Sequence, residues 1–176
     1  MSKKKVSKLK ETKVEIKEQQ AVLRSAFYPY MPQKMELPLL AILAAILYVN
    51  SLWGGFVLDD VMSVTNNAFV QKGITGIGKI LSTDSLFGFV GYTNDLQGGR
   101  YRPFPLILFA IEHQIWGNNP FYFHLMNIVF WVSTVCVLYV LLKKYLFKSS
   151  PEIALISTLI FIVHPIHTEV VANIKS

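Results

Sequence analysis

Two long runs of uncharged, mostly apolar residues constrain the fold of this chain more than any other feature. The first covers 21 residues, 37–57, and the second covers 22 residues, 121–142. A helix needs about 20 apolar residues to cross the roughly 30 Å of hydrocarbon in a membrane. Hydrophobic residues make up 52% of the chain and charged residues only 16%, which differs strongly from a soluble domain. The sequence therefore predicts an all-α membrane protein and excludes a large soluble enzyme domain.

A third apolar segment follows the second run after a lysine-containing turn. It opens with Ser149 and Glu152 at capping-box spacing, and Pro151 suits the first helical turn. Its purely apolar part, 153–163, has only 11 residues, so it either continues through residues 164–171 or stays short and buried. We expect it to continue, which gives three transmembrane helices at about 37–57, 121–142 and 152–171.

The connection between the first two runs, residues 58–120, is long and rich in the polar and glycine residues of turns. Near its end, residues 103–116 form an apolar and then polar pattern that begins at two prolines and is short for a span. We expect an interfacial helix there, with Glu112 and His113 on its solvated side.

His124 and Asn127 share one face of the second span, which favours contacts between helices over catalysis.

The distribution of basic residues predicts the orientation of the chain. Nine of the 17 lysines and arginines lie within residues 1–36, three lie in the turn 143–150, and four lie in the connection 58–120. Positively charged residues close to spans remain in the cytoplasm. We therefore expect residues 1–36 to be a disordered cytoplasmic leader and residues 37–176 to be a membrane domain whose external loop is 58–120. Basic residues concentrated in a polar leader do not indicate nucleic-acid binding.

The compartment is indicated by what the sequence lacks. The one cysteine, Cys136, excludes an intrachain disulfide. The basic leader is too long, and the first apolar run too complete, for a cleaved signal peptide. Both observations favour a bacterial inner membrane over an endoplasmic reticulum. Because the chain stops directly after a polar cluster, we also expect it to be the front part of a longer protein.

Asp59 and Asp60 follow the first apolar run directly, at the depth where a span meets the lipid headgroups. Carboxylates are destabilising inside hydrocarbon, so this position favours a function or a partner. Three interpretations remain open. The pair marks the helix exit, supplies a general base, or holds a divalent cation through hard oxygen ligands. A divalent metal is thus the one cofactor that the sequence suggests, and none is assigned.

Arg100, Tyr101 and Arg102 precede Pro103 at the start of the predicted interfacial helix. Two guanidinium groups at a helix start are suited to binding a phosphate, because the helix amides add positive potential. Anionic lipid headgroups offer the same chemistry. The sequence therefore predicts phosphate binding by Arg100 and Arg102 without separating a lipid-linked substrate from an ordinary membrane lipid.

His164, His167 and Glu169 gather at the end of the third apolar segment. Their spacing differs from the i, i+4 histidine pair of zinc-binding helices, and Pro165 disturbs the turn that would align the ligands, so we assign no metal. Two interpretations remain. The proline kinks the helix exit and the histidines cap it or bond to neighbouring carbonyls, or the three polar side chains form one wall of an active site.

The order of these segments resembles the amino-terminal part of the transmembrane and tetratricopeptide-repeat O-mannosyltransferase-like proteins. The resemblance covers residues 37–176, and the aspartate pair together with the His-Pro-Ile-His-Thr-Glu block is its most specific part. The matching segments are Asp59-Asp60 with Thr65-Asn66-Asn67, Tyr101-Arg102-Pro103, Phe123–Asn127 and His164–Ala172. The resemblance implies a multi-span glycosyltransferase of the C-type fold, of which this chain is an N-terminal fragment.

The resemblance also implies a polyprenyl- or dolichyl-phosphate sugar donor and a carboxy-terminal repeat array that recruits protein acceptors. Asp59 and Asp60 match the acidic catalytic motif. Arg102 matches the arginine of the Tyr-Arg-Pro motif, and donor-phosphate binding is inferred for it from its charge. The pocket-lining residues implied are Tyr101, His164, His167 and Glu169.

Together these features predict transfer of a sugar, mannose in this family, from a lipid-phosphate donor to protein hydroxyl groups on the non-cytoplasmic side. We expect the isolated chain to be inactive, because no repeat array or later span lies within its 176 residues. The alternative is a non-catalytic membrane anchor for a tetratricopeptide-repeat interaction domain. A transporter is a weaker interpretation, because it requires ionisable groups at mid-membrane.

Overall fold

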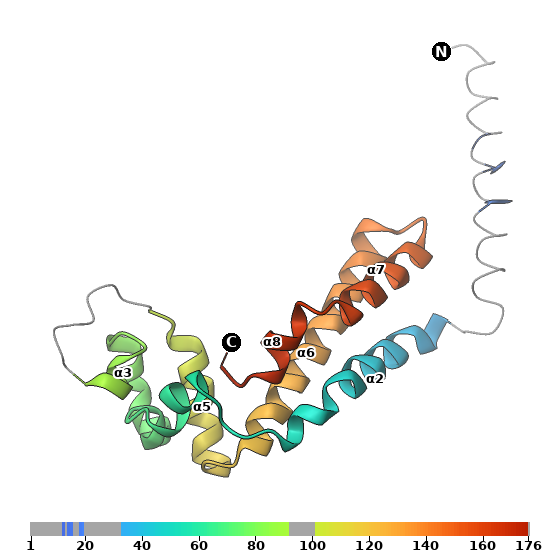
Figure 1. Ribbon diagram of the computed structural model, residues 1–176. Helices are drawn as coiled ribbons and strands as arrows, with labels where there is room; N and C mark the ends of the chain where they lie inside the picture. The colour runs from blue at the N-terminus through green and yellow to red at the C-terminus, as the bar shows by residue number, and fades with distance from the viewer. Residues whose placement is uncertain (1–11, 13, 16–17, 20–32, 92–100, 176) are drawn as a thin grey trace, which may run out of the picture. The chain divides into compact units, whose positions relative to one another are not determined.

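A computed structural model describes residues 12, 14–15, 18–19, 33–91 and 101–175 (Figure 1). Most of the predicted leader, and Arg100, lie outside the described residues. Across the described ranges the regular structure is helical and contains no strand. In chain order the helices are η1 (Gln33–Met35), α2 (Glu36–Tyr48), η2 (Val49–Trp53), η3 (Val61–Thr65), η4 (Val70–Gly76), α3 (Ile77–Ser82), α4 (Phe87–Val90), α5 (Pro103–Trp116), α6 (Pro120–Leu141), η5 (Leu142–Leu146), α7 (Pro151–Val163) and α8 (His167–Ala172).

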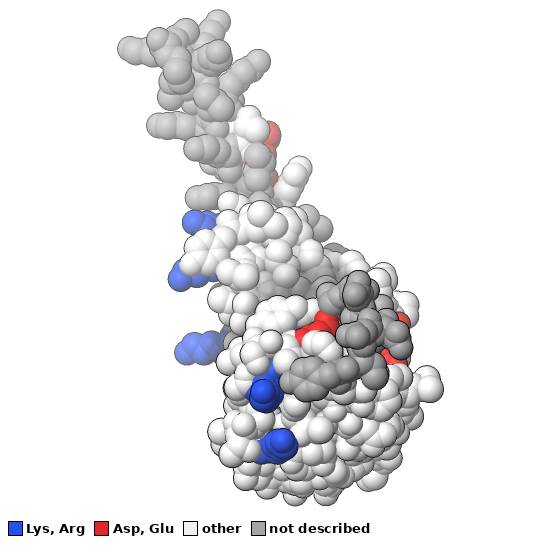
Figure 2. All heavy atoms as spheres, turned by 90° about the vertical axis from the view of Figure 1, so that its left-hand side faces the viewer, with Lys and Arg blue, Asp and Glu red and all other residues white. Residues whose placement is uncertain are grey.

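Two helical stretches in the described part are long and apolar enough to cross a membrane. They are Glu36–Trp53, with 18 residues, and Pro120–Leu146, with 27 residues. The core helix of a soluble protein is mostly buried, whereas only 22% of the most apolar window of each stretch is buried. Figure 2 shows one face of the molecule, on which residues other than Lys, Arg, Asp and Glu predominate. The sequence prediction of an all-α chain with these two apolar helices is confirmed.

The predicted third span over residues 152–171 is wrong. Helix α7 ends at Val163 after 13 residues, and a separate six-residue helix, α8, begins at His167. The break falls at Pro165, which has no backbone N–H to donate and disfavours the helical conformation of the preceding residue, His164. At 1.5 Å per residue, α7 covers about 20 Å, which is less than the roughly 30 Å of membrane hydrocarbon.

The chain forms two compact units. The first comprises residues 1–43 and 134–162, and the second comprises residues 44–133 and 163–176. In the first unit, the carboxylate of Glu36 is only 3% exposed and accepts hydrogen bonds from the Tyr139 hydroxyl and the Lys143 ammonium group. A buried carboxylate without partners would be strongly destabilising. These bonds therefore fix the start of α2 against the end of α6.

The second unit has its core around α5, which packs mainly against η4. Residues from the whole unit contribute to this core, and its buried members are Val64, Val70, Ile80, Leu106, Phe109, Ala110, Phe123 and Ile174. The sequence pattern indicated turns between residues 58 and 102, but η3, η4, α3 and α4 occupy much of this segment. Because these helices are short, their stability comes from packing within the unit: η3, η4 and α3 pack against α5, and α4 packs against η3.

Helix α5 begins and ends where the sequence analysis placed it. Pro103 and Pro105 lie at its start, and Gly117 follows its end with φ +63°, a conformation that favours glycine. The expectation for Glu112 is wrong, because its side chain is 5% exposed and faces the interior of the unit. The interfacial location of α5 remains a prediction.

Candidate functional site

Asp60 is held in place by backbone groups. It is 1% exposed, its Oδ2 accepts a bond from the Val57 N–H at 3.1 Å, and its own N–H donates to the Val57 carbonyl at 2.8 Å. These reciprocal bonds close a turn in which Leu58 has φ +40°, a value uncommon for a residue other than glycine. The turn buries Asp60 and leaves the Asp59 side chain 56% exposed.

Both aspartates contact Lys175, a residue that the sequence analysis did not identify. The Oδ1 atom of Asp60 accepts a bond from the Lys175 N–H at 2.6 Å, and Asp59 Oδ2 lies 2.6 Å from the Lys175 ammonium nitrogen. Asp60 therefore positions the backbone of Lys175, and Asp59 positions the Lys175 ammonium group. The sequence pattern gave no signal for this residue, because a lysine after a helix is ordinarily a solvated cation close to the helix end.

Asn127 fixes the segment that carries Lys175 onto α6. Its side-chain amide donates to the carbonyl of Asn173 at 2.7 Å and to the carbonyl of Ile174 at 3.4 Å. Asn127 thus has a structural contact, but its partners lie in the segment after α8, and the predicted contact between helices remains a prediction. His124, on the same helical face, is 2% exposed and leaves no space for a side chain at Gly54, whose added Cβ would lie 2.9 Å from the histidine Nε2.

The segment before α5 is fixed to α3 and to the connection between α3 and α4. The Tyr101 hydroxyl donates to the Leu81 carbonyl at 2.8 Å, and the Arg102 N–H donates to the Ser85 hydroxyl at 2.8 Å. Ser85 is itself held by Asn67, a fully buried side chain whose amide approaches the Ser85 carbonyl at 3.5 Å. Arg102 is thus positioned through a chain of contacts within the second unit.

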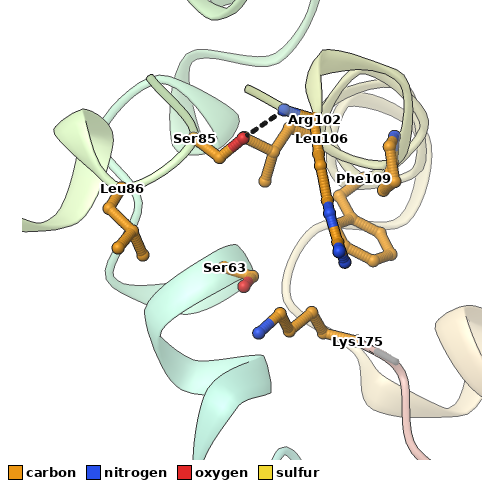
Figure 3. Close-up of a pocket in the computed structure, with 8 residues that line it drawn as sticks. Ser63, Ser85, Leu86, Arg102, Leu106, Phe109 and Lys175 are labelled. Carbon is orange, nitrogen blue, oxygen red and sulfur yellow. Dashed lines mark hydrogen bonds between the residues drawn. The ribbon is translucent and has the colours of Figure 1, made fainter. Parts of the chain in front are cut away.

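A cavity of about 90 Å³ lies where these segments meet (Figure 3). Arg102 and Lys175 extend toward it from the start of α5 and from the segment after α8, with the Lys175 ammonium group directed toward Ser63. The full lining consists of Ser63, Ser85, Leu86, Arg102, Pro105, Leu106, Phe109 and Lys175. Two cations, two hydroxyls and an apolar wall suit an anionic group that is attached to an apolar one.

His164, His167 and Glu169 do not line this cavity. The His167 ring packs against Trp131, with 4.7 Å between ring centroids, and His164 Nδ1 accepts a bond from the Ile166 N–H at 3.3 Å. Burial, and then the nearby His164, lower the pKa of His167 below its usual value. His164 therefore bonds to the backbone across Pro165, and the predicted contribution of these residues to an active-site wall remains a prediction.

The described residues contain no group of three or more His, Cys, Asp or Glu side chains that could hold a metal ion. Asp59 and Asp60 are adjacent in sequence and both contact Lys175, but Asp60 accepts backbone N–H groups, whereas Asp59 contacts the ammonium group. The site is thus organised around the carboxylates of Asp59 and Asp60 and the ammonium group of Lys175. Arg102 lines the same cavity as Lys175.

The sequence is similar to several known proteins. It is 38% identical over 136 residues to protein O-mannosyl-transferase TMTC1 of Homo sapiens, covering 77% of this chain and 15% of that protein. It is 30% identical over 139 residues to protein O-mannosyl-transferase TMTC3 of Mus musculus, covering 79% of this chain and 14% of that protein. It is 32% identical over 134 residues to protein O-mannosyl-transferase F38B6.6 of Caenorhabditis elegans, covering 75% of this chain and 19% of that protein. No protein-family model and no solved structure matches the chain.

These matches relate the chain to the class of protein O-mannosyl-transferases. More particularly, it is homologous to a small part of the TMTC proteins, and it spans about 15% of the length of TMTC1. This confirms the resemblance found in the sequence. The relatives are animal proteins, so the expected bacterial inner membrane is not supported.

Proposed function

We propose that this chain contributes catalytic residues to a membrane glycosyltransferase. The enzyme transfers a sugar, mannose, from a polyprenyl- or dolichyl-phosphate donor to protein hydroxyl groups. The proposal is supported by the contacts that bring the predicted acidic and basic groups together. Asp59 contacts Lys175, and Lys175 lines the same cavity as Arg102. A carboxylate beside a cationic cavity supplies a base for the acceptor and counter-charge for the leaving phosphate.

The reaction proceeds as an inverting displacement. The acceptor oxygen gives its proton to an aspartate carboxylate and attacks the anomeric carbon from the face opposite the lipid phosphate. The bond between that carbon and the phosphate oxygen breaks, and the phosphate leaves with the electron pair. Arg102 stabilises the charge that develops on it, and Arg100 precedes Arg102 by only two residues in the sequence.

Of the two aspartates, Asp59 is the better candidate for the base. Its side chain is 56% exposed, whereas Asp60 is 1% exposed and has both carboxylate oxygens bonded to backbone N–H groups. A base must reach the acceptor proton within hydrogen-bond distance, directly or through one water. Asp60 is then a positioning residue for Lys175.

Replacement of each aspartate by asparagine in the product of the complete coding sequence tests these roles. We expect Asp59→Asn to abolish sugar transfer from a polyprenyl-phosphate donor while its melting temperature stays unchanged. Asp60→Asn is expected to lose transfer together with thermal stability, by about 1.5–3 kcal/mol, because a charged acceptor of two backbone bonds is removed. Transfer of radiolabelled mannose and thermal unfolding measure the two effects.

Asp84→Asn is the matched control for this experiment. Asp84 lies outside the cavity lining, and asparagine keeps the oxygen that accepts the Leu86 N–H at 2.9 Å. This variant should transfer sugar as the unmodified protein does. Undiminished transfer by Asp59→Asn, or no transfer by the unmodified complete product, would instead favour the non-catalytic membrane anchor.

A further inference from the structure

One turn of α6 contacts both halves of the candidate site, and all the residues concerned belong to the second unit. Asn127 holds the segment that carries Lys175. His124, three residues earlier, lies against Gly54 in the segment that leads to Asp60, and a Cβ added to Gly54 would be 2.9 Å from His124 Nε2. The Asp60 carboxylate in turn accepts the Lys175 N–H at 2.6 Å. These contacts form a closed ring that begins and ends on α6.

His124 is a polar residue in an environment that excludes water. It is 2% exposed, and neither of its ring nitrogens has a hydrogen-bond partner among the described residues. A buried polar group without a partner is destabilising, so the imidazole indicates a role beyond apolar packing. The carboxylate of Asp60, a residue that is 1% exposed, lies close enough to interact electrostatically with the ring. Such an interaction is stronger in a buried site than in water.

We propose that His124 is a positioning residue for the transfer reaction, because its ring fixes the turn of residues 57–60 against α6 and stabilises the ionised Asp60 carboxylate. The inference rests on the proposed function and adds one residue to its site. An ionised carboxylate is the stronger acceptor for the two backbone bonds that Asp60 makes, to the N–H groups of Val57 and Lys175. His124 thereby holds the turn that carries Asp59 at a fixed position relative to the Lys175 segment.

Two adjacent glycines provide a matched pair of substitutions for the contact with His124. A Cβ at Gly54 would meet His124 Nε2 and, at 3.0 Å, the Ser51 carbonyl oxygen, whereas a Cβ at Gly55 would meet nothing within 4 Å. Gly54→Ala should therefore displace the ring from the turn, and Gly55→Ala should leave it in place. Gly54→Ala should have a smaller effect in a His124→Ala background, because the closest atom that it displaces is absent there.

Amide hydrogen exchange tests the positioning without requiring sugar transfer. It is measured by mass spectrometry on the detergent-solubilised product of the complete coding sequence. The N–H groups of Val57 and Lys175 report on the site, because both donate to Asp60. His124→Leu and Gly54→Ala should each raise the exchange rate of peptides containing these groups by about 10-fold or more, because bonds to a charged acceptor are weakened. Unchanged exchange in both variants would overturn the positioning role.

Two variants and one internal peptide are the controls for this measurement. Gly55→Ala should exchange as the unmodified protein does. His124→Gln keeps a polar N–H donor at this position and should exchange within about threefold of the unmodified protein. Exchange in η4, which belongs to the core around α5, should be the same in every variant. An increase in η4 equal to that at the two reporting groups would indicate general destabilisation and would overturn the specific role of His124.

Steady-state kinetics of sugar transfer separate positioning from donor binding. His124→Leu should lower kcat by about 10- to 100-fold and leave KM for the lipid-phosphate donor within about twofold, because the turn that carries the base is displaced. His124→Gln should recover most of kcat. An equal loss in His124→Gln and His124→Leu would show that the polar ring has no part in the reaction. If the unmodified product transfers no sugar, the proposed function fails, and hydrogen exchange still decides whether His124 fixes the turn.

Discussion

Glu112 is a buried residue whose environment destabilises the ionised form of its carboxyl group. Its side chain is 5% exposed, and its Oε2 atom has no hydrogen-bond partner among the described residues. Burial raises its pKa to about 7 from the usual 4.5. The folded protein therefore favours the protonated carboxyl group, which can donate a hydrogen bond and carries no charge into the interior.

This shift predicts that the stability of the protein depends on pH. Between pH 4.5 and 7 the folded state keeps the Glu112 proton and the unfolded chain releases it. The contribution of Glu112 to stability should therefore be highest below pH 4.5, decrease by up to about 3 kcal/mol as pH rises to 7, and show no further decrease above that. Glu112→Gln should remove the decrease, as measured by thermal unfolding across this range. The exposed Glu169→Gln is the control, and a Glu112→Gln variant with the original pH slope would contradict the assignment.

Asp59 and Asp60 show how far single residues could be predicted from the sequence. Their position after an apolar run was sufficient to identify the pair as a candidate site. Their different roles were not predictable, because they depend on the turn at Leu58 and on a residue more than a hundred positions away, Lys175. Glu112 was misplaced for a similar reason, since the short helices that cover α5 had no recognisable sequence pattern.

At the scale of elements, Asn67 and Gly88 connect the short helices that support Arg102. Asn67 Oδ1 accepts the N–H groups of Phe69 and Val70, at 3.1 and 3.2 Å, just before and at the start of η4. Gly88, in α4, lies so close that a Cβ added to it would be 1.9 Å from this oxygen. The absence of a side chain at Gly88 therefore permits the contact between α4 and the segment before η4.

Gly88→Ala should consequently destabilise the protein by about 1–3 kcal/mol, because Asn67 must move out of its buried position. Gly78→Ala in α3 is the matched substitution, since a Cβ at Gly78 meets nothing within 4 Å. It should be neutral or stabilise by up to about 1 kcal/mol, because alanine favours a helix more than glycine does. Thermal unfolding of the two variants measures the difference, and equal melting temperatures would exclude this packing.

The long elements were more predictable than the short ones for a physical reason. The helices α2, α5 and α6 contain enough apolar residues and clear enough starts to be recognised locally. Helices η3, η4, α3 and α4 have four to seven residues each and depend on contacts with α5 or, for α4, with η3. The third span was overextended because the apolar composition of α7 was weighed above the effect of Pro165.

At the scale of the whole molecule, the candidate site is assembled from parts that the sequence separates widely. Lys175 lies 115 residues from Asp60, and Arg102 lies between them in the chain. The sequence could identify Asp60 because it follows an apolar segment, and Arg102 because it precedes one. It could not identify Lys175, because its role appears only after Asn127 fixes the end of the described chain onto α6.

The orientation predicted from charge places Lys72 of the connection 58–120 outside the cytoplasm and Lys148 of the turn 143–150 inside it. Both lysines are exposed, so cysteine substitutions there should tolerate labelling once Cys136 is replaced by serine. In sealed vesicles whose outer face is cytoplasmic, a membrane-impermeant maleimide should label Lys148→Cys at once. Lys72→Cys should react only after the membrane is permeabilised. Labelling of Lys72→Cys in sealed vesicles would place Asp59 and the cavity beside it in the cytoplasm, where the proposed acceptors on the opposite side are out of reach.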